Sequence, residues 1–142
     1  MNQPHDLHLA DARAAAASAE ITSDASTRVA QLREMVATFV ADRDWHQFHS
    51  PKNVAMGIAI EAAELMEHFQ WITGEASRQI KDDPHTLAEV GEELADIICY
   101  CIALANELDL DISRIMTHKM AKNRRKYPAD RSRGHFAPPP SE

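Results

Sequence analysis

Residues 60–96 read IEAAELMEHFQWITGEASRQIKDDPHTLAEVGEELAD, and two acidic pairs lie within this stretch. Glu61 and Glu64 form one pair, and Glu93 and Asp96 form the other. A spacing of three residues places both members of a pair on one face of a helix, about one turn apart. The same faces carry apolar residues typical of a core stripe, where an unpaired carboxylate is costly. Two helices with their pairs facing each other around a metal ion would remove this cost, whereas a solvated surface is the simpler alternative.

The composition of the 142-residue chain predicts a single all-α domain. Hydrophobic residues make up 44% of the sequence, which is enough for a core, and the chain has only 4 glycines. No apolar run approaches the roughly 20 residues of a membrane-spanning helix, so we expect no membrane association. The net charge of −7 argues against a surface that coats a nucleic acid polymer.

The two cysteines, Cys99 and Cys101, lie in an apolar helical run and cannot pair with each other there. Buried free thiols are typical of a reducing compartment. The first twenty residues lack the apolar core of a signal peptide. We therefore predict a cytoplasmic protein.

Four helices are expected from apolar periodicity and start signals. Ser50-Pro51 and Asp83-Pro84 each combine a cap residue with Pro at the first helical position. The expected helices cover about residues 23–42, 51–71, 84–107 and 112–125, and Gly74 is expected to end the second. Short connectors predict an antiparallel four-helix bundle. The third helix is apolar on more faces than one bundle can bury, which predicts that the protomer oligomerises.

The expected organisation has three parts. Residues 1–24 are polar and rich in Ala, which predicts a flexible or loosely packed extension. Residues 25–128 form the folded domain. Residues 129–142 end in a Pro-rich tail.

The connector at residues 43–49, expected to be non-helical, concentrates ring-bearing side chains. It contains Trp45, Phe48 and two histidines, His46 and His49. These rings either pin a loop to the core or form a wall for a flat ligand such as a nucleobase. Composition alone leaves the two interpretations open.

Carboxylate oxygens favour Mg²⁺ or Mn²⁺ over softer metals. Residues 119–133 carry seven basic side chains and only one acid, which suggests a phosphate-bearing ligand. Together these features suit a hydrolase of phosphate esters or diphosphates. In such a site the two acidic pairs would hold the metal. A carboxylate of the cluster or the neighbouring Glu92 would orient the attacking water, and Lys119 with Arg124 or Arg125 would neutralise the phosphates.

Four segments in order resemble the MazG-like, all-α nucleoside triphosphate pyrophosphohydrolases, and the dCTP pyrophosphatase branch in particular. They are Arg43-Asp44-Trp45-x-Gln47-Phe48-His49-x-Pro51-x-Asn53, Phe69-Gln70-Trp71, Glu92-Glu93-Leu94-Ala95-Asp96-Ile97-x-x-Tyr100, and Lys119-Met120-x-x-Asn123-Arg124-Arg125-Lys126-Tyr127-Pro128. The acidic pattern of Glu61-x-x-Glu64 followed by Glu93-x-x-Asp96 resembles the same family. The resemblance covers about residues 27–130.

The resemblance implies a Mg²⁺-dependent homotetramer, a dimer of dimers, that cleaves a nucleoside triphosphate to the monophosphate and pyrophosphate. It implies dCTP or a related pyrimidine deoxynucleotide as substrate. By position, Glu61, Glu64, Glu93 and Asp96 match metal ligands. Trp45 and Trp71 match the base pocket, which turns the connector at residues 43–49 into an expected base wall that includes His49. Tyr100, Lys119 and Asn123 match positions near the sugar and phosphates, with Arg125 beside them.

One departure from the family pattern concerns the base. Val36 stands where the animal dCTP enzymes have a histidine near the base, which makes base preference the least constrained expectation. Two alternatives from other classes are a nucleotide-binding protein without catalysis and a regulatory helical protein that works through a partner.

Overall fold

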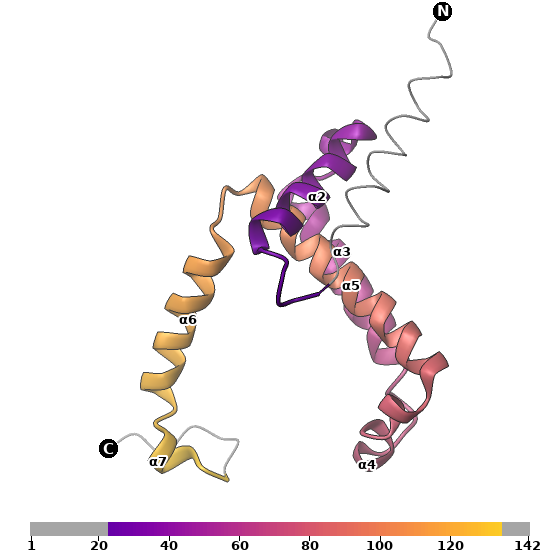
Figure 1. Ribbon diagram of the computed structural model, residues 1–142, viewed down its shortest axis with the longest axis vertical. Helices are drawn as coiled ribbons and strands as arrows, with labels where there is room; N and C mark the ends of the chain where they lie inside the picture. The colour runs from indigo at the N-terminus through magenta and orange to yellow at the C-terminus, as the bar shows by residue number, and fades with distance from the viewer. Residues whose placement is uncertain (1–22, 135–142) are drawn as a thin grey trace, which may run out of the picture. The chain divides into compact units, whose positions relative to one another are not determined.

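The computed structural model describes residues 23–134, and every regular element in this range is helical, so the predicted all-α class is confirmed. The long helices are α2 (Val29–Asp42), α3 (Pro51–Glu67), α5 (Pro84–Glu107) and α6 (Ile112–Lys126) (Figure 1). Shorter elements are α4 (Gly74–Ser77), α7 (Ala129–Ser132) and the 3-10 turns η1 (Trp45–Gln47) and η2 (Ile80–Asp82).

The predicted start signals of α3 and α5 are confirmed, and α6 has a capped start as well. The Ser50 hydroxyl accepts a hydrogen bond from the Asn53 amide at 3.4 Å, and Pro51 is the first helical residue. Asp83 caps α5 by accepting from the His85 amide at 3.1 Å. Asp111 caps α6, where its carboxylate accepts from the Arg114 amide at 2.8 Å. Each cap satisfies an amide that the first helical turn leaves without a partner.

Three predicted boundaries are wrong. The first helix begins at Val29, because residues 23–26 form a separate turn. α3 ends at Glu67 and not near Trp71, since the backbone tightens into turns from Met66 onward. Gly74 does not end a helix but begins α4, which the Thr73 hydroxyl caps. The connector at residues 43–49 was predicted to be non-helical but contains the 3-10 turn η1. Asp44, the residue before η1, adopts a left-handed backbone with φ 53°.

α3 and α5 pack side by side and run antiparallel (Figure 1). Gly57 of α3 lies against Tyr100 of α5, and Glu64 further along α3 lies near Glu93 earlier on α5. α2 packs on α5 near its carboxyl end, where Arg33 and Asn106 exchange two hydrogen bonds of 2.8 and 3.1 Å. The antiparallel pairing brings the two acidic segments to the same level.

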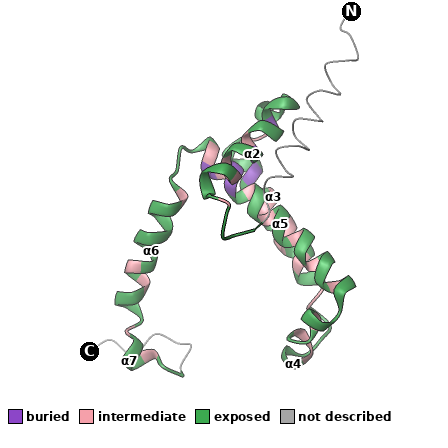
Figure 2. Ribbon diagram, in the orientation of Figure 1, coloured by how far each residue is buried: buried purple, intermediate pink, exposed green. Residues whose placement is uncertain are grey.

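The core of the described chain is small and lies where α2, α3 and α5 meet (Figure 2). Its buried members are Val36, Val40, Val54, Ile102, Ala103 and Ala105. Cys99 and Cys101 are exposed, so the prediction that both thiols are buried is wrong for this chain by itself. The described helices that pack on α5 leave these two positions uncovered.

The chain divides into two compact units, residues 1–109 and 110–142. The first contains α2, α3 and α5, and the second contains α6 and α7; each is described by itself. Nearly all of the predicted extension, residues 1–22, lies outside the described residues, as do residues 135–142 of the predicted tail. No described helix is long and apolar enough to cross a membrane.

Candidate metal centre and adjoining pocket

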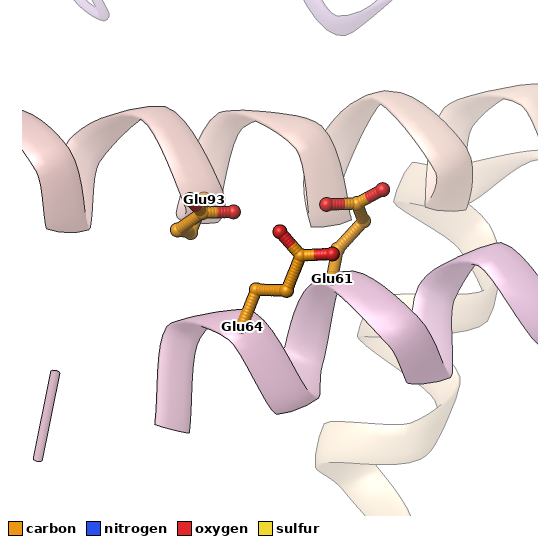
Figure 3. Close-up of side chains that lie close together, drawn as sticks. All are labelled: Glu61, Glu64 and Glu93. Carbon is orange, nitrogen blue, oxygen red and sulfur yellow. The ribbon is translucent and has the colours of Figure 1, made fainter. Parts of the chain in front are cut away.

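Three carboxylates gather between α3 and α5. Glu61 and Glu64 project from α3 toward Glu93 of α5 (Figure 3). One oxygen from each of the three lies within 4.8 Å of the others. The three-residue spacing on α3 and the antiparallel packing of α5 together produce this acidic cluster, as the sequence predicted.

The acidic cluster is electrostatically unfavourable without a cation. Desolvation raises the pKa of Glu61 above its usual range, and repulsion from Glu64, Asp96 and Glu93 raises it further. Among residues 23–134, no ion pair neutralises any of these carboxylates. Oxygen donors in this number and charge fit a divalent cation such as Mg²⁺. The arrangement therefore suits a metal better than it suits ordinary packing.

Asp96 and Glu92 stand less close to the centre. Asp96 is exposed and near enough to raise the pKa of Glu61, yet it is outside the group of three whose oxygens approach within 4.8 Å. Glu92 is also exposed and lies outside this group. Three of the four predicted ligands are thus brought together, and the fourth flanks them.

A pocket of about 380 Å³ lies next to the acidic cluster on the α3–α5 surface. Its wall continues along α3 to Ile60, the residue before Glu61. Predicted substrate residues His49 and Tyr100 both line it. The full lining is Phe48, His49, Asn53, Val54, Met56, Gly57, Ile60 and Tyr100.

The ring of Trp45 stacks on the ring of His49, which lines the pocket. Their centroids are 6.2 Å apart and their planes differ by 16°. Phe39 meets Trp45 edge-on with ring centroids 5.7 Å apart, and the Arg43 guanidinium lies over the Phe39 ring at 3.7 Å from its centroid. Trp45 is thereby held in a ring stack whose inner member, His49, reaches the pocket.

The other predicted substrate residues lie in the turn after α3 and in the second unit, which is described by itself. Trp71 is 87% exposed in the turn after α3 and is not among the pocket residues. Lys119, Asn123 and Arg125 all belong to α6 in the second unit, where Asn123 is half-buried and the two cations are exposed. Val36, expected near the base, is a buried core residue of α2.

Sequence reasoning missed Met56, Gly57 and Ile60 as pocket residues. Gly57 matters most, because a Cβ there would lie 2.9 Å from Cε1 of Tyr100. Its lack of a side chain allows the Tyr100 ring to lie directly on α3. A glycine inside an otherwise strong helical pattern was the available signal, since glycine there weakens a helix unless close packing requires it.

Comparison with known proteins agrees with this geometry. The MazG-like family model matches residues 56–135. Proteins named dCTP pyrophosphatase 1 from Homo sapiens and Bos taurus are 42% and 41% identical over 103 residues, which is 72% of this chain. This match spans 60% of the human relative and 61% of the bovine one.

A solved structure is similar as well. The crystal structure of a pyrophosphatase from Archaeoglobus fulgidus has a TM-score of 0.66 and 33% identity to this chain. The match covers 77% of this chain and 99% of the archaeal one. The acidic cluster on paired helices, the matched family model and the shared fold agree, and the chain belongs to the MazG-like family.

Proposed function

We propose that this chain hydrolyses a nucleoside triphosphate to the monophosphate and pyrophosphate, with dCTP or a related pyrimidine deoxynucleotide as preferred substrate. The observation that carries the proposal is the adjacency of the acidic cluster and the pocket, since Ile60 lines the pocket and Glu61 belongs to the cluster. A metal-bound triphosphate and its base could then occupy neighbouring sites. The names of the similar proteins, dCTP pyrophosphatase 1, support the choice of reaction and substrate.

Glu61, Glu64 and Glu93, with Asp96 beside them, would hold Mg²⁺, and Mn²⁺ could replace it. When bound, the cation supplies charge neutralisation for the phosphate oxygens. A carboxylate of the cluster, Glu61 or Glu64, or the nearby Glu92, accepts a proton from the attacking water.

The base would lie in the pocket against His49, which Trp45 supports by stacking. Tyr100, which rests on Gly57 and lines the same pocket, would lie near the sugar. For the remaining positions, the proposal follows the family resemblance. Trp71 would add to the base pocket, and Lys119, Asn123 and Arg125 would contact the phosphates.

We also propose a homotetramer, a dimer of dimers, that works in the cytoplasm on free nucleotides and not on a nucleic acid polymer. The support is the apolar surface that one chain leaves uncovered on α5, including Leu94 at 48% and Ile98 at 46% exposure. A partner chain over this surface would also cover Cys101, which lies seven residues after Leu94 on the same helical face.

The test is a panel of common and modified nucleoside triphosphates with Mg²⁺, in which both products are measured. Monophosphate with pyrophosphate supports the proposal, and diphosphate with orthophosphate contradicts it. Glu64→Gln and Asp96→Asn should each abolish pyrophosphate release while circular dichroism shows an intact helical fold. Nucleotide binding without any cleavage would instead indicate the non-catalytic alternative.

A further inference from the structure

The loop between α2 and α3, residues 43–50, carries both rings of the Trp45–His49 stack. Most side-chain hydrogen bonds of this loop stay local. Among residues 23–134, those made by Arg43, Gln47, His49 and Asn53 all end within residues 39–53. His46 differs, because its Nδ1 lies 3.2 Å from Oε1 of Glu107 on α5, 61 residues away. This contact joins the loop to a distant helix.

We call the His46–Glu107 contact the tether. The backbone of the loop has a conformation that such a contact helps to maintain. Asp44 has φ 53°, in the left-handed region that is unfavourable for a residue with a side chain even though Asp tolerates it better than most. Strained segments persist when surrounding contacts determine their position. Trp45 directly follows Asp44, so any relaxation of Asp44 would move the indole ring.

The other end of the tether is firmly placed. Glu107 is the last residue of α5, and its neighbour Asn106 is bound to Arg33 of α2 through two hydrogen bonds. The Glu107 side chain is only 26% exposed, compared with 60% for His46. The Glu107 side chain is thus the less exposed partner of the contact, and it lies at the end of a helix that Arg33 of α2 also contacts.

α5 also carries the other parts of the proposed site in a regular order. Glu93, Tyr100 and Glu107 follow one another in steps of seven residues, which places them on one face of the helix at intervals of about 10 Å. One member each of the acidic cluster, the pocket wall and the His46–Glu107 contact therefore lies on the same helix, α5. The tether sets the position of the aromatic stack relative to that element.

We propose that Glu107, acting through His46, is a positioning residue that holds the Trp45–His49 stack against the nucleotide pocket. Nδ1–H of His46 donates to the Glu107 carboxylate and keeps η1 in place. This role rests on the proposed function, because the base is what the stack would contact. Neither Glu107 nor His46 touches the reacting phosphates, so their loss should affect substrate affinity and leave the chemical step intact.

The first measurement uses the ligand-free protein and does not require activity. In a Trp71→Phe background, Trp45 is the only tryptophan, and its quenching by acrylamide reports how well the loop is held. We expect His46→Ala and Glu107→Ala to raise the quenching constant about twofold, with no further rise in the double variant, because each removes the same contact. Glu107→Gln keeps an acceptor and should restore part of the protection.

The second measurement is steady-state hydrolysis of the best nucleotide with the native Trp71. KM should rise roughly three- to tenfold in His46→Ala and Glu107→Ala, the size expected for one lost hydrogen bond to a charged group, while kcat changes less than about twofold. His85→Ala is the matched control, since it removes a His–Glu contact of 3.4 Å within α5 alone. It should change neither quenching nor KM.

Unchanged quenching of Trp45 in Glu107→Ala would overturn the tether. Increased quenching with an unchanged KM would overturn its role in nucleotide positioning. A parent chain that cleaves no nucleotide would contradict the proposed function, and the quenching series would still decide whether Glu107 holds the loop.

Discussion

Glu61 is the residue at which burial and neighbouring charge both oppose the ionised form of the side chain. Partial desolvation and three neighbouring carboxylates all favour its protonated form. An apolar side chain would avoid both costs at this position. A carboxylate beside Glu64 and Glu93 is physically reasonable when a cation reverses the repulsion, which makes the free energy of unfolding sensitive to metal and to pH.

Glu61→Gln should separate stability from activity. Removal of one negative charge relieves repulsion in the metal-free protein, so we expect a small rise in Tm, on the order of 1 °C. Pyrophosphate release should fall at least about 100-fold, because a proposed metal ligand is lost. Glu67→Gln is the matched control on the same helix outside the acidic cluster, and it should change neither quantity. Full activity of Glu61→Gln would contradict the assignment of Glu61 to the metal site.

The pH dependence of this effect has a defined sign. The folded protein raises the pKa of Glu61, so it binds more protons than the unfolded chain between the two pKa values. Stability of the metal-free protein should therefore fall as pH rises through this range. The Tm advantage of Glu61→Gln should disappear in acid and be largest at neutral pH, as thermal melts without metal would test. Saturating Mg²⁺ should stabilise the wild type more than the variant.

Gly57 and Gly91 are helical glycines that differ in whether a neighbouring side chain lies close to them, so the same substitution can be compared at both. A methyl group added at Gly91 of α5 would meet no neighbouring side chain or element within 4 Å, so Gly91→Ala should raise stability by about 0.5–1 kcal/mol through better helix propensity. Gly57→Ala has the same propensity gain but meets Tyr100 at 2.9 Å. We expect it to lose that gain and to raise KM as the ring shifts into the pocket. Equal stabilisation by both substitutions in denaturant melts would show that Tyr100 moves without cost.

At the scale of elements, local chemistry explains which boundaries were predictable. Ser50-Pro51 and Asp83-Pro84 act on amides within a few residues, so the starts of α3 and α5 can be read directly from sequence. The end of α3 could not be read in this way. Phe69 continues the apolar periodicity past Glu67. The turns that end the helix depend on backbone hydrogen bonds that cannot be predicted from the residue types at these positions.

The Asp83 cap yields a prediction about α5 as a whole. The Thr86 hydroxyl and the His85 amide donate to the Asp83 carboxylate and lower its pKa. Its stabilising effect is present at neutral pH and is lost as pH falls through the lowered pKa. Asp83→Ala should lower Tm by a few degrees at pH 7 and by less in acid. Asp83→Asn keeps a cap without a titrating charge, so its Tm difference from Asp83→Ala should persist in acid.

At the scale of the whole molecule, the acidic cluster was predictable from sequence and the pocket was not. Helical periodicity places Glu61 and Glu64 on one face, and two helices with such faces have few ways to pack. The pocket depends on Gly57 accepting Tyr100 and on the path of the loop before α3, which are long-range contacts. The positions of Lys119, Asn123 and Arg125 relative to the acidic cluster remain predictions of the family resemblance.

Assembly should depend on the uncovered side of α5. Sedimentation equilibrium of the native chain should give a species near four times the 15.9 kDa chain mass. Ile98→Glu places a charge on an exposed apolar position and should shift the population to smaller species. Gln79→Glu adds the same charge in the connector between α4 and η2 and should leave the mass unchanged. A monomeric native chain across micromolar concentrations would contradict the proposed tetramer.

The seven-residue spacing of Glu93, Tyr100 and Glu107 means that α5 sets the backbone distances between the acidic cluster, the pocket wall and the tether. The rise of an α-helix fixes about 10 Å between each of these levels, and no side-chain adjustment can lengthen it. A ligand that engages both levels must present one group to the metal and another to the pocket wall. A free nucleobase has no phosphate for the metal, and inorganic pyrophosphate has no base for the wall, so we expect each to bind more weakly than the intact nucleotide.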